Sequence, residues 1–172
     1  TALAVITGPN KTVTFALDDV DGNLMRVTGQ AEIDLFGLTT VTGGFGLEKK
    51  TDQTLYVSGG AGVEANTAVS ANLLTIGLAD VSAFVGYDGV GLSLTGVNLA
   101  LVLWSEVGGA KRKWNSVMAS GNASFAGIEG LTLTATNVGI EINQQANDNT
   151  VVDYQQGTGE SHATALAVIT GP

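Results

Sequence analysis

The sequence predicts an all-β fold of antiparallel strands in repeated hairpin-like modules, forming either a sandwich or an elongated stacked sheet. Three observations support this prediction. Apolar and polar residues alternate with a period of two, turn-forming residues separate these runs, and blocks of sequence recur along the chain. A helix would need apolar residues three and four positions apart, and no convincing run of that kind occurs.

The alternation is clearest from Met25 to Leu35, where odd positions are apolar or small and even positions are polar or charged. Residues 11–17 and 117–125 show the same pattern. Because successive side chains of a strand point to opposite faces, each run predicts a strand with one buried and one wet face. The side chains expected to point inward include Val13, Phe15, Leu17, Val117 and Phe125. Turn pairs such as Asp88-Gly89 separate the runs.

The residues Thr-Ala-Leu-Ala-Val-Ile-Thr-Gly-Pro occur twice, as 1–9 and as 164–172. The offset between the copies is 164 − 1 = 163 residues. It predicts that 1–163 form one unit of a tandem array and that 164–172 begin the next unit; a duplicated tag is the alternative. Residues 2–6 lack alternation, so we expect a strand covered on both faces. We expect both copies to be extended and to turn at Gly-Pro, one packing on its own unit and the other on a neighbour.

A shorter repeat lies inside this unit. The run Gly130 to Ile140 matches Gly91 to Leu101 at an offset of 39 residues, and Gly37-Leu38-Thr39 begins a fainter third copy. The predicted modules span about 25–57, 77–114 and 117–154. We expect the strands holding Leu38, Leu92 and Leu131 to be equivalent, with the same face buried. A lone hairpin cannot hide its apolar face, so the modules should stack.

The runs Val90 to Leu103, Gly130 to Thr134 and Val81 to Gly86 resemble repeats of giant bacterial extracellular proteins, over roughly residues 25–155. Those proteins carry long arrays of β-rich units and are regarded as surface or matrix components. The resemblance implies an exported, non-enzymatic role, and it carries no catalytic or binding residues.

Charge and composition exclude several classes of partner. The chain has 16 acidic and 7 basic residues, a net charge of −9, and no cysteine. An acidic surface is repelled by nucleic acid and by anionic membranes. No apolar run approaches the roughly 20 residues that a membrane-spanning helix needs. The expected partners are therefore neighbouring repeat units, copies of the chain itself, or a glycan or other surface ligand.

Catalytic motifs are missing from the sequence. The single histidine, His162, lies in a polar stretch that predicts a solvated loop, and neither a Gly-x-Ser-x-Gly elbow nor a P-loop occurs. We therefore expect no enzymatic activity and no bound cofactor except possible calcium. A carbohydrate-active enzyme is a distant alternative, for which no convincing acid pair is present.

The candidate metal ligands are Asp18, Asp19 and Asp21, which lie on a glycine-containing turn between two predicted strands. Closely spaced carboxylates of this kind can bind Ca²⁺, although a plain acidic turn is the simpler interpretation. Residues 147–149 with Asp153 form a weaker second candidate.

Most of the basic residues fall in two clusters, Lys49-Lys50 and residues 111–113. These clusters could contact carboxylates of a neighbouring unit, or they could be solvated loops. Trp104 and Trp114 flank the second cluster and are expected to cap the edge of the core rather than to bind a sugar.

Taken together, the sequence predicts an extracellular or cell-surface structural unit, such as a spacer, stalk or fibre segment, that associates head to tail into filaments. The alternative is a calcium-assisted adhesin module that binds a glycan or a partner protein.

Overall fold

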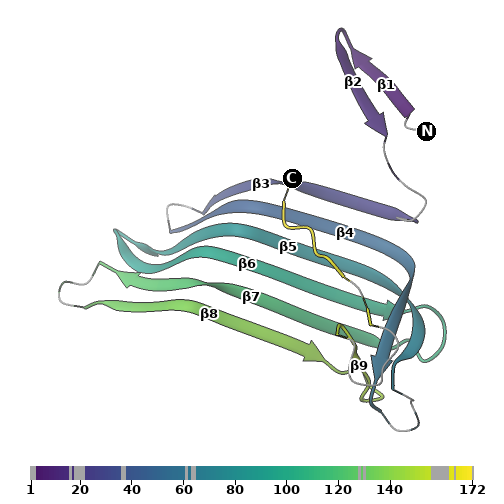
Figure 1. Ribbon diagram of the computed structural model, residues 1–172. Coiled ribbons are helices and arrows are strands. Elements are labelled where there is room, and N and C mark those ends of the chain that lie inside the picture. The colour runs from purple at the N-terminus through teal and green to yellow at the C-terminus, as the bar shows by residue number, and fades with distance from the viewer. Residues whose placement is uncertain are drawn as a thin grey trace.

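The computed structural model describes residues 3–15, 17, 22–35, 38–60, 62, 65–127, 129, 131–155, 163–164 and 166–171. Its strands are β1 (Leu3–Gly8), β2 (Lys11–Phe15), β3 (Leu24–Leu35), β4 (Thr39–Ser58), β5 (Thr67–Tyr87), β6 (Val90–Glu106), β7 (Lys113–Ala126), β8 (Leu133–Gln144) and β9 (Val151–Val152). Strands β3 to β8 follow chain order in one curved antiparallel sheet, and β9 pairs with β4 (Figure 1). The described residues contain no helix, so the prediction of an all-β antiparallel fold is confirmed.

Strands β1 and β2 form a separate two-stranded hairpin. Figure 1 shows this hairpin standing apart from the large sheet, with β3 as the nearest labelled strand. Residues 2–6 were expected to form a strand covered on both faces, with a neighbouring unit of the array supplying the cover, and this stays a prediction. Within the described residues of one chain, strand β1 pairs with β2, and the side chains of Val5 and Ile6 are 39% and 82% exposed.

A tight turn joins two of the long strands of the meander, β5 and β6. Strands β4, β5 and β6 contain 20, 21 and 17 residues, and the two residues Asp88 and Gly89 connect β5 to β6. Both turn residues have positive φ, 51° and 77°, as a two-residue hairpin turn requires. The turn chemistry seen in the sequence therefore sets the pairing of these two strands.

Three β-bulges share one hydrogen-bonding arrangement. At each bulge, a short polar residue has a φ between 50° and 55°, and its backbone N–H donates to an asparagine Oδ1 on a neighbouring strand. The pairs are Asp52 with Asn72, Asp80 with Asn98 and Asn137 with Asn122, at 3.2, 3.2 and 3.0 Å. At each bulge the pairing register shifts, and the asparagine accepts the backbone N–H that has lost its partner in the ladder. The strand can therefore bend at the bulge while its side chains stay assigned to the same two faces of the sheet.

The pairing register gives the sheet two different faces. One row of directly paired residues is wholly aliphatic across six strands: Val27, Leu47, Ile76, Leu101, Val117 and Ile142. The adjacent row on the opposite face is mixed: Arg26, Glu48, Thr75, Val102, Ser116 and Asn143. We call the first the open face. The second is the covered face, because residues 166–171 and the return segment 145–155 lie on it (Figure 1).

The buried core occupies one end of the covered face. Its members are Leu55, Val57, Val69, Ala71, Leu73, Val102, Trp104, Trp114, Ala146 and Val152, with Tyr154, Leu166 and Val168 packed against them. Trp104 and Trp114 are 3% and 0% exposed, so both lie within the core, whereas the sequence predicted that they cap its edge. The Trp114 Nε1–H donates to the carbonyl and to the hydroxyl of Thr150, which ties the return segment to the sheet.

Two sequence expectations about burial are wrong for the same reason. Val13 and Leu17 are 51% and 67% exposed rather than inward. Leu38, Leu92 and Leu131, expected to share a buried face, are 44%, 42% and 47% exposed. The alternation identified strands correctly, but no second layer of described residues covers the apolar sides of these strands. Leu38 lies one residue before β4, Leu92 lies inside β6, and Leu131 lies two residues before β8.

We predict that Trp114→Phe lowers the free energy of unfolding by about 1–3 kcal/mol, because the buried Thr150 hydroxyl loses its donor and the Thr150 carbonyl keeps only the Ala146 N–H. Trp104→Phe is the matched control, since its Nε1–H donates only to the Tyr154 hydroxyl, which keeps its bond to Ser116. Urea unfolding measures both. An equal or larger loss for the Trp104 variant would contradict this role of Thr150.

Candidate functional site

The C-terminal copy of the duplicated segment lies on the covered face. Thr164 anchors it: the N–H of Tyr56 donates to Thr164 Oγ1 at 2.9 Å, and the N–H of Thr164 donates to the carbonyl of Asp153 at 2.7 Å. Leu166 and Val168 then pack against the buried core. Figure 1 shows this segment as the yellow trace that crosses the sheet toward β3. The copy therefore contributes to the packing of its own unit.

A line of glycines makes room for this segment, and we call the resulting channel the trough. It is formed by Gly44 and Gly46 of β4 and Gly77 of β5, of which Gly46 and Gly77 are direct pairing partners. A methyl group on Gly46 or Gly77 would overlap the carbonyl oxygen of Ile169. A methyl group on Gly44 would lie 3.2 Å from the carbonyl oxygen of Thr170. The backbone can approach the sheet this closely only because these positions lack side chains.

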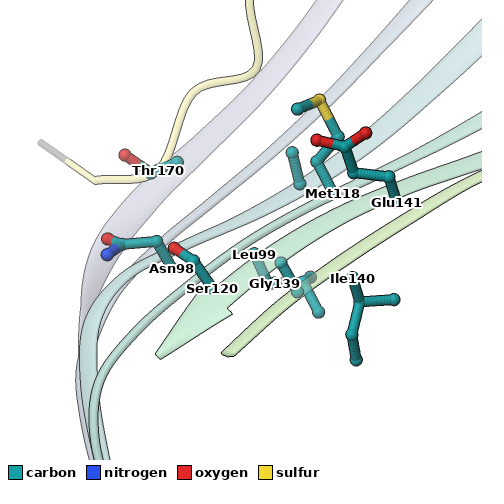
Figure 2. A pocket seen from close by; sticks show the side chains of 10 residues that line it. Asn98, Leu99, Met118, Ser120, Gly139, Ile140, Glu141 and Thr170 are labelled. Carbon is teal, nitrogen blue, oxygen red and sulfur yellow. The ribbon is translucent and has the colours of Figure 1, made fainter. Parts of the chain in front are cut away.

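A hollow of about 320 Å³ lies beside the trough, over β6, β7 and β8. It is bounded by Thr170 of the C-terminal segment and lined on the covered face by Asn98, Ala100, Met118, Ser120 and Glu141. Figure 2 shows Met118 and Glu141 on the side of the sheet from which Thr170 approaches, with Ile140 pointing the opposite way. The hollow is thus unfilled space on the covered face, alongside the seated segment.

The trough is charged at the end nearest the core. Glu48 is 3% exposed, and its carboxylate contacts Arg26 Nη2 at 2.7 Å and Lys50 Nζ at 3.3 Å. These three residues line a pocket together with Leu166, Ala167 and Ile169. One of the basic clusters noted in the sequence therefore contributes to an ion pair inside the unit.

Arg112 organises a second charged group at the edge of the core. Its guanidinium contacts Glu106 Oε1 at 2.8 Å and Asp148 Oδ2 at 3.0 Å, and it lies 5.2 Å from the centre of the Trp114 ring. The hydrogen bond from Arg112 lowers the pKa of Glu106. Burial alone would raise the pKa of Asp148, but hydrogen bonds from Thr150 and Arg112 outweigh it and lower that pKa.

The predicted calcium ligands are only partly described. Asp18, Asp19 and Asp21 lie outside the described residues, as does His162. In the second candidate cluster, Asp148 is bound to Arg112 and Thr150, whereas Asp153 accepts a hydrogen bond from Ser58. Within the part of the chain that the structure describes, no three acidic or histidine side chains are grouped as metal ligands. The calcium site stays a prediction.

The trough was missed in the sequence, although a signal for it is present. Gly44, Gly46 and Gly77 resemble ordinary strand glycines or turn residues until the strands are paired. The signal lies in the spacing of Gly44 and Gly46, two residues apart in one strand and therefore on the same face. Only the register brings Gly77 beside them.

Comparison with protein-family models, with curated proteins and with solved structures gave no match. Among the described residues there is no helix of the length and apolar character needed to cross a membrane.

We predict that Arg112→Gln lowers the free energy of unfolding at neutral pH by about 1–3 kcal/mol, since two carboxylates lose a charge-assisted partner. The folded-state pKa values of Glu106 and Asp148 are lowered, so their contribution is present above the unfolded values of 4.5 and 3.8. This contribution to stability is lost as the pH falls through the folded-state pKa values of the two carboxyl groups.

The difference in stability between the Arg112→Gln variant and the original chain should therefore shrink as pH is lowered below about 4.5, as measured by urea unfolding at each pH. Arg112→Lys keeps the positive charge but loses the planar guanidinium that contacts two carboxylates. Its free energy of unfolding should therefore lie between those of the original chain and the Arg112→Gln variant. A stability difference that stays constant down to pH values where both carboxyls are protonated would contradict the assignment.

Proposed function

We propose that this chain is a structural unit, a spacer, stalk or fibre segment of an exported tandem-repeat protein, rather than an enzyme. It acts outside the cell or at the cell surface, and its partners are neighbouring repeat units or copies of itself. Association of such units head to tail produces filaments. The open face of the sheet is the observation that carries the structural role and the association of copies. Contact between two open faces joins copies in pairs, so head-to-tail continuation uses a second, different surface.

The open face is apolar and lacks a covering layer among the described residues. In the aliphatic row, Val27 and Ile142 at the two sheet edges are 48% and 49% exposed, while the four central members are half-buried by their neighbours. A second row beside it consists of Gly29, Phe45, Leu78, Leu99, Ala119 and Ile140. Neither row contains a charged residue. Contiguous apolar surface of this kind is characteristic of an interaction site.

A second β-sheet is the partner that fits this surface. Two twisted sheets pack face to face about 10 Å apart, with side chains of the two inner faces interdigitating. The net charge of −9 opposes association of like chains, but the two apolar rows keep that charge away from the proposed contact. Another unit of the same sequence presents the same rows, and this supports a neighbouring unit or copy as the partner.

The edges of the sheet also favour association. Among the described strands, β3 pairs with β4 alone, and every residue of β8 is exposed. Exposed edge strands with apolar residues offer unpaired backbone N–H and C=O groups to another chain. Monomeric proteins usually cover or charge such edges, which prevents pairing between molecules. In an array of units these edges would lie next to further copies.

We predict that the chain self-associates with rising concentration, and that Ile142→Lys weakens this association about tenfold or more by placing a charge on the open face. Thr134→Lys is the matched control, since it adds the same side chain to β8 on the opposite face, where Thr134 pairs with Ser124. Sedimentation velocity measures both variants. A chain that stays monomeric, or equal effects of the two substitutions, would contradict the proposal.

A further inference from the structure

We propose that residues 3–8 of one copy of this chain occupy the trough of a second copy, in the place that residues 166–171 hold within their own chain. This inference rests on the proposed function, because it names the contact by which units associate head to tail. The trough is the acceptor, and strand β1 with its hairpin is the donor.

The first argument is the identity of the two segments. At the offset of 163 residues, Leu3, Val5 and Ile6 correspond to Leu166, Val168 and Ile169. Leu166 and Val168 pack against the core, and the carbonyls of Ile169 and Thr170 lie over the glycines of the trough. The same residue types of the other copy can make each of these contacts. A site that accepts one copy therefore has the shape and chemistry to accept the other.

The second argument is the different burial of the two copies. Ile6 is 82% exposed on β1, whereas Ile169 is half-buried in the trough. Val5 is 39% exposed, whereas Val168 packs against the core. Seating β1 in a trough would therefore remove apolar surface from water that the hairpin leaves exposed in its own chain.

The third argument is space for the rest of the hairpin. Strand β1 enters with β2 at its side, and paired strands lie about 4.8 Å apart. The hollow beside the trough, over β6, β7 and β8, lies next to the seated segment at Thr170. It offers room on the covered face for part of β2, whereas the described residues of the C-terminal copy have no paired strand beside them.

These features describe an exchange of identical segments between copies. One segment leaves the trough and the same sequence from a neighbour enters, so the trough contacts are retained and the burial of β1 is offset by exposure of the displaced segment. Contacts of β2 with the hollow are additional and favour the exchange. Donor and acceptor are different surfaces of the chain, so the contact is heterologous and continues from copy to copy as a filament. The C-terminal copy competes with this assembly by occupying the trough of its own chain.

The duplicated sequence provides a matched pair of variants in the full chain. Ile169→Asp weakens the seated copy and leaves the donor intact, whereas Ile6→Asp makes the same change in the donor and leaves the seated copy intact. We expect Ile169→Asp to associate at concentrations about tenfold or more below those of the unaltered chain, since the competing segment is released. We expect Ile6→Asp to lose trough-dependent association. Sedimentation velocity compares the variants, and circular dichroism checks that both are folded.

A labelled peptide tests the trough directly. Fluorescein-labelled Thr-Ala-Leu-Ala-Val-Ile-Thr-Gly-Pro should bind the full-length Ile169→Asp variant about tenfold or more tightly than the unaltered chain, and an excess should dissociate its assemblies. The same peptide with aspartate in place of isoleucine is the control and should not bind. Fluorescence anisotropy gives both affinities.

The inference is overturned if Ile169→Asp associates no more strongly than Ile6→Asp, or if the peptide does not bind the Ile169→Asp variant. Association that Ile142→Lys abolishes, but that neither duplicated-segment variant alters, would overturn the trough contact while leaving the proposed structural function standing. Conversely, assemblies that the peptide dissociates and that Ile142→Lys does not weaken would support the trough and remove the open face as the contact.

Discussion

The continuous antiparallel ladder from β3 to β8 is the constraint on which the other features of this protein depend. Because six strands hold one register, residues far apart in the sequence form straight rows across the sheet. One face receives the aliphatic row from Val27 to Ile142. The other receives the tryptophans, the buried Glu48 and the glycines of the trough. A slip of one residue in any strand would exchange its contributions between the faces.

The bulges show how that register survives in strands of about twenty residues. A long regular strand accumulates twist, and the extra residue at a bulge lets it bend. Asp52, Asp80 and Asn137 occupy left-handed conformations that short polar residues tolerate, and a neighbouring asparagine accepts each backbone N–H. The same arrangement at three places leaves the register unbroken between the bulges, where the two aliphatic rows lie.

A one-layer sheet of this kind buries apolar surface efficiently only where something lies on it. Here the return segment and residues 166–171 cover one end of one face, and the core is confined to that end. The core combines apolar packing with specific polar ties, among them the bond from Trp114 to Thr150 and the Arg112 contacts to Glu106 and Asp148. The remaining apolar surface has no internal partner among the described residues, so the structural role proposed for the chain follows from the arrangement of its layers rather than from any single residue.

The sequence by itself determined the strand class, the positions of several strands such as Met25 to Leu35, and the turn at Asp88-Gly89, because period-two alternation and turn residues act through local backbone geometry. The turn expected at Gly43-Gly44 lies instead inside β4. The sequence also predicted that Trp104 and Trp114 pack at the edge of the core. Tertiary structure alone decided which apolar sides are covered, and the expectations for Val13, Leu17 and the three leucines were therefore wrong. The duplicated segment is the clearest case, since one sequence forms a paired strand in β1 and an unpaired segment in the trough at residues 166–171. Both states satisfy the local preferences of these residues, and the difference between them comes from what lies beside each copy.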